Sequence, residues 1–368
     1  DHGFRRGQSN GAVFYNPESD TRAMVHGDDF LVLAKQSEID GFEAMLRSRY
    51  ELKKLANLGY GPTDSQSGVF LNRVVHILEG SRVLKPRVAV EPDSRHARLI
   101  ARELGLDERT KGTDVPMPKR TAEEQFRDWD SPALGPEAAK LYRSCTMRVA
   151  YLAQDRVDLG EASKTLARFM QQPTEGAMGM LKRVARYLIK HPQTRRVFED
   201  TKLPEKIRVF VDSDHAGCAV TRKSTTGYVV RFGHSTVKHG SNLQSTTALG
   251  SGESEYYALV KAGKEGLGFQ SLLSDWGLSL PLEVSSDSSA ARGHINRRGL
   301  GKMRHIQTRY LWIQERVGEG HLRITSVPGT KNVVDMLTKC GPGVTLVKHM
   351  NTAGFEYSGA HSSQRGLF

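Results

Sequence analysis

The chain has 368 residues, with 53 Lys and Arg against 41 Asp and Glu, a net charge of +12 and 38% hydrophobic residues; this composition suits one to three folded domains and excludes a disordered chain. No run approaches the roughly 18 apolar residues of a membrane span, and the first residues show neither an initiator methionine nor a signal peptide, so we expect a piece of a longer, non-secreted protein. Three widely spaced cysteines exclude a disulfide framework and a cysteine-only zinc site, and a reducing compartment is expected.

The N-terminal part is predicted to begin with strands. Residues 11–34 are expected to form a hairpin that carries two acids, Asp28 and Asp29, at its tip. A helix is expected to begin at Ser37, whose side chain can cap it. Residues 66–90 alternate weakly and are predicted to return to strands.

The next part is predicted to be mostly helical. Residues 93–105 have the apolar spacing of a helix, and a proline separates two longer helices at 139–172 and 174–190. Residues 110–137 show little periodicity and are expected to be a linker or extended arm. Prolines bracket the connection at 192–204, which is predicted to be a domain boundary.

From residue 206 the predicted order changes to three strands, a helix, a strand, two helices, a strand and a helix. The segments with clear patterns are 207–211, 226–232, 235–239, 253–276, 282–286, 306–317, 322–327 and 332–339. This alternation predicts a mixed α/β layer architecture.

Two stretches without acids carry much of the positive charge. Residues 1–139 have a net charge of −2, so the excess of positive charge lies later in the chain. The two stretches are 181–198, which is predicted to present a basic helix face, and 292–309, which is predicted to be a basic loop. Such surfaces favour a polyanionic partner, most simply nucleic acid, although a solvated basic surface is the alternative. The candidate phosphate contacts are Lys182, Arg186, Lys190, Arg298, Lys302 and Arg304.

Four acids stand at the ends of predicted elements in this last part. Asp212 ends the first strand and Asp287 ends the fourth. Glu255 opens the first helix and Asp335 begins the last. Carboxylates that meet at one sheet edge repel one another unless cations lie between them. Two Mg²⁺ ions about 3.5–4 Å apart, one activating water and the other stabilising the leaving oxygen, would suit phosphodiester hydrolysis.

Six motifs occur in order between residues 205 and 340. They are VDSDHAG at 211–217, RKSTTGY at 222–228, SGESEYYAL at 251–259, DSSAA at 287–291, RHI at 304–306 and VPGTKNVVDMLTK at 327–339. Together they closely resemble the ribonuclease H domain of copia-type retrotransposon polyproteins. Catalytic, metal-binding carboxylates of that family match Asp212, Glu255, Asp287 and Asp335 by position, and the neighbouring Asp214 and Glu253 do not. The resemblance implies hydrolysis of the RNA strand of an RNA–DNA hybrid with two Mg²⁺ ions, for which Mn²⁺ is a substitute.

The front of the chain resembles the same polyprotein. MVHGDDFLV at 24–32 looks like the palm hairpin of a reverse transcriptase, whose paired aspartates, here Asp28 and Asp29, bind catalytic Mg²⁺. Segments within 141–188 look like the region that joins polymerase to ribonuclease H. The third polymerase carboxylate and the fingers have no counterpart before Asp28, so we expect that this chain alone does not polymerise.

The resemblance divides the chain into four segments. Residues 1–90 would be the C-terminal part of a reverse transcriptase palm, 91–204 a mostly helical thumb or connection region with a linker, 205–340 a ribonuclease H-like mixed-sheet α/β domain, and 341–368 an uninformative tail. The expected partners are an RNA–DNA hybrid or other nucleic acid and the remainder of the Pol polyprotein, without a membrane. The implied location is cytoplasmic, in a virus-like particle, or nuclear.

Two other functions stay open at this point. A nucleic-acid-binding remnant without catalysis would show salt-sensitive binding and no Mg²⁺-dependent cleavage, and an integrase-like nuclease would cut duplex DNA. Gly27, His215 and Gln307 depart from the usual residues of the family, and Gly27 is expected to loosen its hairpin. A histidine often assists product release in this family, but we expect His305 to pack or cap.

Overall fold

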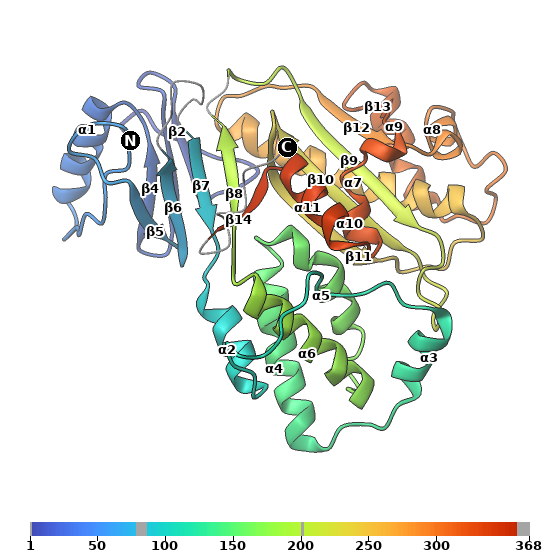
Figure 1. Cartoon of the computed structure of the whole chain (residues 1–368). Helices are drawn as coiled ribbons and strands as arrows, with labels where there is room; N and C mark the ends of the chain where they lie inside the picture. Colours follow the sequence, from blue (N-terminus) through green and yellow to red (C-terminus); the bar gives the residue numbers. More distant parts are fainter. Residues whose placement is uncertain (1, 79–86, 200–201, 359–368) are drawn as a thin grey trace.

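The computed structural model describes residues 2–78, 87–199 and 202–358. Within these ranges the chain forms three β-sheets and a group of helices that lies below the sheets in the view of Figure 1. Parts of the predicted palm segment (1 and 79–86), of the predicted linker (200–201) and of the predicted tail (359–368) lie outside the described residues.

The first sheet is antiparallel and contains the predicted hairpin. Its strands, in the order β1-β2-β3-β4, are β1 (Arg5–Arg6), β2 (Val13–Asn16), β3 (Thr21–His26) and β4 (Asp29–Leu33). Gly27 has a φ of 60° in the two-residue turn between β3 and β4, at a position where glycine is favoured. The expectation that this glycine loosens the hairpin is therefore wrong. Helix α1 (Gln36–Arg47) follows, but Lys35 and not Ser37 is its N-terminal cap residue.

The second sheet joins segments that are far apart in the sequence. Its order is β14-β8-β7-β6-β5, all antiparallel. The strands are β5 (Ser67–Phe70), β6 (Arg73–Leu78), β7 (Arg87–Glu91), β8 (Gln193–Glu199) and β14 (Phe355–Ser358). Strand β8 lies in the stretch predicted as a connection, so this prediction is wrong for residues 193–199, and β14 lies in the tail, for which the sequence made no structural prediction. The predicted division into four segments stays a prediction, but this sheet takes strands from three of them.

The helical region lies between these sheets in the sequence. Its elements are α2 (Arg95–Glu103), α3 (Ala122–Asp130), α4 (Pro136–Leu152), the 3₁₀ turn η1 (Val157–Leu159), α5 (Gly160–Ala167) and α6 (Glu175–Lys190). Helix α3 lies in the predicted linker, where Thr121 and Glu124 cap it reciprocally. The predicted helix 139–172 is interrupted after Leu152, and in this break the fully buried Arg156 is paired with Asp158 at 2.6 Å.

The third sheet has the order β11-β10-β9-β12-β13. Its strands are β9 (Ile207–Asp214), β10 (Thr225–Phe232), β11 (Ser235–Leu243), β12 (Leu282–Ser286) and β13 (Arg323–Ser326). Strands β9, β10 and β11 are antiparallel, whereas β12 runs parallel to β9, and β13 parallel to β12. This mixed sheet is the ribonuclease H-like architecture that the motifs imply, and the predicted order of strands and helices is confirmed.

Helices cover both faces of the third sheet. They are α7 (Ser251–Asp275), α8 (Ser289–Ile295), η2 (Thr308–Leu311), α9 (Trp312–Gly318), η3 (Gly329–Lys331), α10 (Asp335–Thr338) and α11 (Gly343–Thr352). Buried Val209 of β9 packs in one cluster with Leu259 of α7, and Val229 of β10 packs in another with Leu337 of α10. Of the helices in the described ranges, none combines the length and the apolar character needed to cross a membrane.

Gly227 allows α10 to approach the sheet closely. It lies opposite Asp212 in the β9–β10 register. A Cβ atom at Gly227 would lie 2.7 Å from Val334 and 2.8 Å from Thr338, closer than packed atoms approach. The missing side chain therefore brings the end of α10 next to the strand that carries Asp212.

Candidate active site

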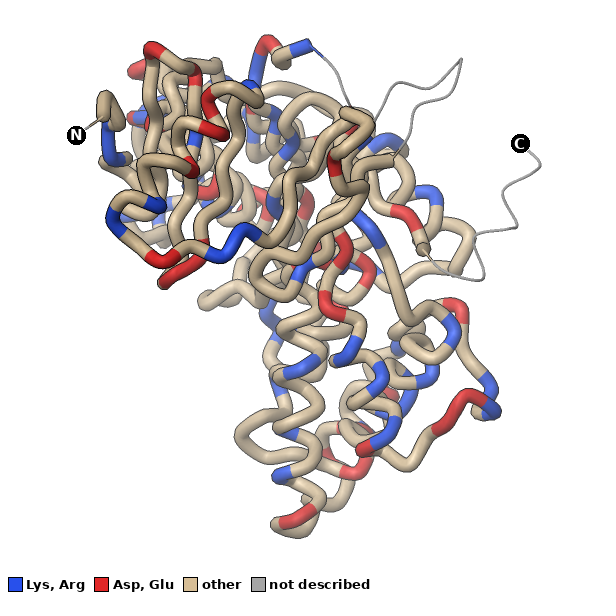
Figure 2. The backbone as a smooth tube through the Cα atoms, turned by 90° about the vertical axis from the view of Figure 1, so that its left-hand side faces the viewer, with Lys and Arg blue, Asp and Glu red and all other residues tan. Residues whose placement is uncertain are grey.

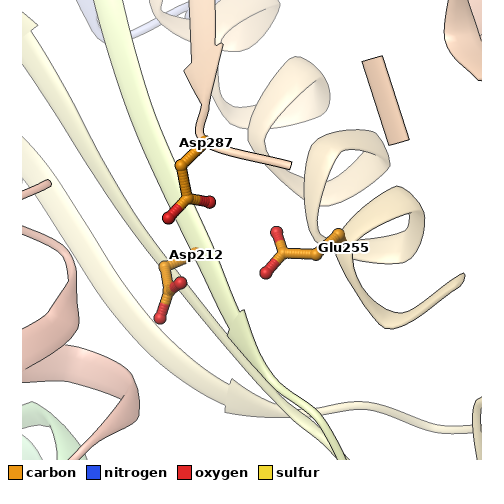
Figure 3. Close-up of side chains that lie close together, drawn as sticks. All are labelled: Asp212, Glu255 and Asp287. Atoms are coloured by element: carbon orange, nitrogen blue, oxygen red, sulfur yellow. The ribbon is translucent and has the colours of Figure 1, made fainter. Parts of the chain in front are cut away.

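Three of the four predicted carboxylates meet at one edge of the third sheet. Asp212 lies in β9, Asp287 directly follows β12, and Glu255 lies near the start of α7 (Figure 3). Their ligand oxygens all lie within 4.8 Å of one another. Because β9 and β12 are parallel neighbours, their C-terminal ends reach the same edge. We call these three residues the carboxylate trio.

The electrostatics of the trio fit a bound cation. Burial, together with the charges of Asp212 and Asp287, raises the pKa of Glu255 to about 8. Its Oε1 accepts a hydrogen bond from the Ser213 amide at 3.3 Å, whereas its buried Oε2 has no hydrogen-bond partner. Clustered carboxylate oxygens with an unsatisfied buried acceptor are the donor set that hard divalent cations prefer. The residues present therefore fit a divalent cation.

Asp335 is not part of the trio. Lys339, one helical turn later, lies between it and Asp212: its Nζ is 2.8 Å from Asp335 Oδ1 and 3.3 Å from Asp212 Oδ2. Burial lowers the pKa of Lys339, but the two carboxylates outweigh this effect and raise it above its usual value. The Thr338 hydroxyl also donates to Asp212. The predicted fourth ligand thus faces a lysine ammonium.

Burial has the largest effect on Asp212 and raises the pKa of its carboxyl, and nearby Asp335 adds to the shift. The Thr338 hydroxyl and the Lys339 ammonium oppose it, because both stabilise the ionised carboxylate. Asp212 is only 2% exposed, so these two side chains are its main compensation for lost solvent.

Glu253 and Asp214, which do not match the metal-binding carboxylates of the family, have hydrogen-bond partners outside the trio. Glu253 accepts hydrogen bonds from the Tyr257 hydroxyl at 2.7 Å and from the Leu249 amide at 2.9 Å. The Nε2 atom of His305 also forms a 2.8 Å hydrogen bond with Glu253, which is not a member of the trio. Asp214 accepts from the Thr225 amide.

The paired aspartates of the first sheet remain exposed. Asp28 lies in the turn after β3 and Asp29 begins β4. Within the described ranges, the trio is the group of acids close enough to share a metal ion, and it does not include either of them. Among the described residues, no third carboxylate lies close enough to Asp28 and Asp29 to share a metal ion with them.

The predicted phosphate contacts lie in two different parts of the fold. Lys182 and Arg186 are exposed on α6, whereas Lys190 is paired with Asp114 at 2.6 Å. The other three predicted contacts are exposed in the loop between α8 and η2. They are Arg298, Lys302 and Arg304. Figure 2 shows basic and acidic residues interspersed over the whole molecule. The two groups therefore lie on separate elements, helix α6 and the loop between α8 and η2.

Thr338 and Lys339 are the site residues that the sequence analysis did not single out. The spacing of Asp335 and Lys339, four residues apart in a predicted helix, indicates an ion pair between them. Their contacts with Asp212 depend on the packing of α10 against β10, for which the local sequence carries no signal.

Comparisons with known proteins agree with the motifs. No protein-family model matches the chain. It is 31% identical over 201 residues to the retrovirus-related Pol polyprotein from transposon RE1 of Arabidopsis thaliana, and 29% identical over 189 residues to that from transposon TNT 1-94 of Nicotiana tabacum. These matches cover 54% and 51% of this chain but only 14% of each polyprotein. Among solved structures, LC11-RNase H1, isolated from compost, is 20% identical with a TM-score of 0.28, over 36% of this chain and 93% of that one.

Proposed function

Because this chain is similar to retrovirus-related Pol polyproteins of copia-type transposons, we propose that residues 205–340 are a ribonuclease H that hydrolyses the RNA strand of RNA–DNA hybrids. The observation that carries the proposal is the carboxylate trio at the edge of a ribonuclease H-like sheet. The implied partners are nucleic acid and the remainder of the polyprotein. The polymerase part is incomplete and is proposed to be inactive by itself.

The trio would hold a divalent cation, Mg²⁺ in the first place and Mn²⁺ as a substitute. When bound, such a cation activates water and stabilises the charge that develops on the phosphodiester. Thr338 orients the Asp212 carboxylate through its hydroxyl, and the Ser213 amide orients Glu255. Asp335 would serve a second cation together with Asp212, once Lys339 has moved away from both.

One observation favours a second candidate function. The Lys339 ammonium already neutralises Asp212 and Asp335, which reduces the need for a second cation between them. A chain that keeps this arrangement would be a catalytically inactive remnant that binds nucleic acid. The two candidates differ in cleavage and not in binding.

The test is cleavage of a hybrid labelled on each strand, with Mg²⁺ or with EDTA. Wild-type chain and an exposed control, Glu108→Gln, are expected to cut only the RNA strand with Mg²⁺, and Asp287→Asn is expected to lose this activity. A bound but uncut hybrid would favour the inactive remnant. Cleavage of duplex DNA would instead indicate an integrase-like nuclease.

A further inference from the structure

A cavity of about 380 Å³ lies beside the trio, between the helical region and the C-terminal domain. Five separate parts of the chain line it: the segment before and within α3, helix α5 with the residues that follow it, one residue of α6, the end of β9 with the residues that follow it, and the end of α10 with the residues that follow it. Thr338 and Lys339 are shared with the site described above, and the proposed function gives no role to the other lining residues. Its cationic lining residues are Lys119, Arg120, Lys164, Arg168 and Lys339.

Positive charge exceeds negative charge in this lining, which also contains Asp128, Glu161 and Asp214. Arg120 is paired with Asp128, and Lys164 lies 3.1 Å from Glu161. Lys339 is paired with Asp212 and Asp335, which do not line the cavity, so Lys119 and Arg168 are the lining cations that these pairs leave without an acid. A cavity with surplus cations recognises an anion.

The two surplus cations, Lys119 and Arg168, have different surroundings. Lys119 is exposed at the cavity and has no ion-pair partner among the described residues. Arg168 is held inside, with its guanidinium 2.7 Å from the Cys218 sulfur and 5.8 Å from the centre of the Trp129 ring. Neither guanidinium contact is to an acid, so the charge of Arg168 remains available to an anion.

Two lining residues connect the cavity to Asp212 of the trio. Thr338 and Lys339 line it, and both also contact Asp212. Apolar side chains, among them Met117, Phe169 and Met180, form another part of its lining. A polymer whose phosphate lies at the trio would therefore find charged and apolar surface directly beside that phosphate.

We propose that this cavity binds one nucleotide of the nucleic-acid strand, next to the phosphate that lies at the trio. The inference rests on the proposed function and deepens it, because it makes the helical region part of the substrate site. The volume is within the range of small-ligand sites, roughly 300–1,000 Å³. The cationic side chains would bind the phosphate of this nucleotide, and the apolar side chains would contact its sugar and base.

The experiment compares two exposed lysines of the same segment in the full chain. Lys119 lines the cavity, whereas Lys111 does not. Binding of a fluorescent RNA–DNA hybrid is measured by anisotropy in Ca²⁺, at several salt concentrations. Lys119→Glu is expected to raise Kd about tenfold and to reduce the salt slope by about one, and Lys111→Glu to change Kd less than about twofold.

The outcomes separate this inference from the proposed function. If wild-type chain binds the hybrid and the two variants behave alike, the cavity does not contact the strand, and the ribonuclease H proposal stands. If wild-type chain binds no hybrid at all, the proposed function fails and this inference fails with it. Since Lys119 is exposed, its replacement leaves the core untouched, and circular dichroism confirms the fold of both variants.

Discussion

Proton competition at Glu255 makes cation binding at the trio depend on pH. A bound cation needs the ionised carboxylate, but burial and the charges of Asp212 and Asp287 raise the pKa of Glu255 from 4.5 to about 8. The proton and the cation therefore compete for the same oxygens near neutral pH. Lower pH must weaken binding, because more of the trio is then protonated.

The magnitude follows from this pKa. Glu255 is protonated in about 99% of the molecules at pH 6 and in about half of them at pH 8. Through this group alone, a cation that binds the ionised form is held about 50-fold more weakly at pH 6, which is about 2.3 kcal/mol. In the metal-free protein, the pH dependence of folding stability has the opposite sign. The contribution of Glu255 to the free energy of unfolding is complete below about pH 4.5 and is lost as the pH rises through 8.

The assay is calorimetric titration of the chain with Mg²⁺ or Mn²⁺, in buffers of different ionisation enthalpy. We expect release of about one proton per ion at pH 6 and about half a proton at pH 8. Glu255→Gln, which has no carboxyl to titrate, is expected to lose most of the pH dependence along with part of the affinity. The exposed control Glu108→Gln should retain the wild-type profile.

Two results would refute this reasoning. One is a dissociation constant that stays within about twofold between pH 6 and pH 8. The other is a Glu255→Gln variant with the same pH slope as the wild type, which would assign the titration to a different group.

Three further variants test the packing around the site. Lys339→Met is expected to let a second divalent ion bind near Asp212, seen as a higher calorimetric stoichiometry, and an unchanged stoichiometry would contradict a blocking role of the lysine. Gly227→Ala is expected to destabilise the chain by about 1–3 kcal/mol in urea unfolding, because the added methyl overlaps α10, whereas Gly268→Ala, with open space around it, should not. Arg156→Leu leaves the buried Asp158 carboxylate unpaired and is expected to cost about 3–5 kcal/mol in the same experiment; equal stability would show that the pair is dispensable.

The order of elements in the third sheet was predictable because each one has a strong local pattern. Strand β9 alternates in hydrophobicity and ends in acids, and α7 has the spacing of a long helix, so Asp212 and Glu255 could be assigned from the sequence. Asp287 was found because it directly follows a short apolar strand. These three assignments needed no information about distant segments.

The remaining features depend on contacts between distant segments. Strand β8 contains arginines that a local reading assigns to a loop, but Arg195 pairs with Glu356 at 2.6 Å and Arg196 with Asp155 at 3.1 Å. The position of Asp335 relative to the trio likewise depends on Lys339. Charged residues that find partners far along the chain leave no periodic signal, which is why the strand and the lysine contact were missed.

The packing of β14 has a consequence for how the C-terminal domain can be isolated. Phe355 and Met350 belong to the same buried cluster as Leu337, whose helix carries Asp335. A fragment cut at residue 340, where the motifs stop, would strip this cover from α10 and expose its apolar side to water. A fragment that keeps this cover on α10 therefore extends to residue 358, beyond the last recognisable motif. The end of the recognisable motifs therefore does not mark the end of the folded domain.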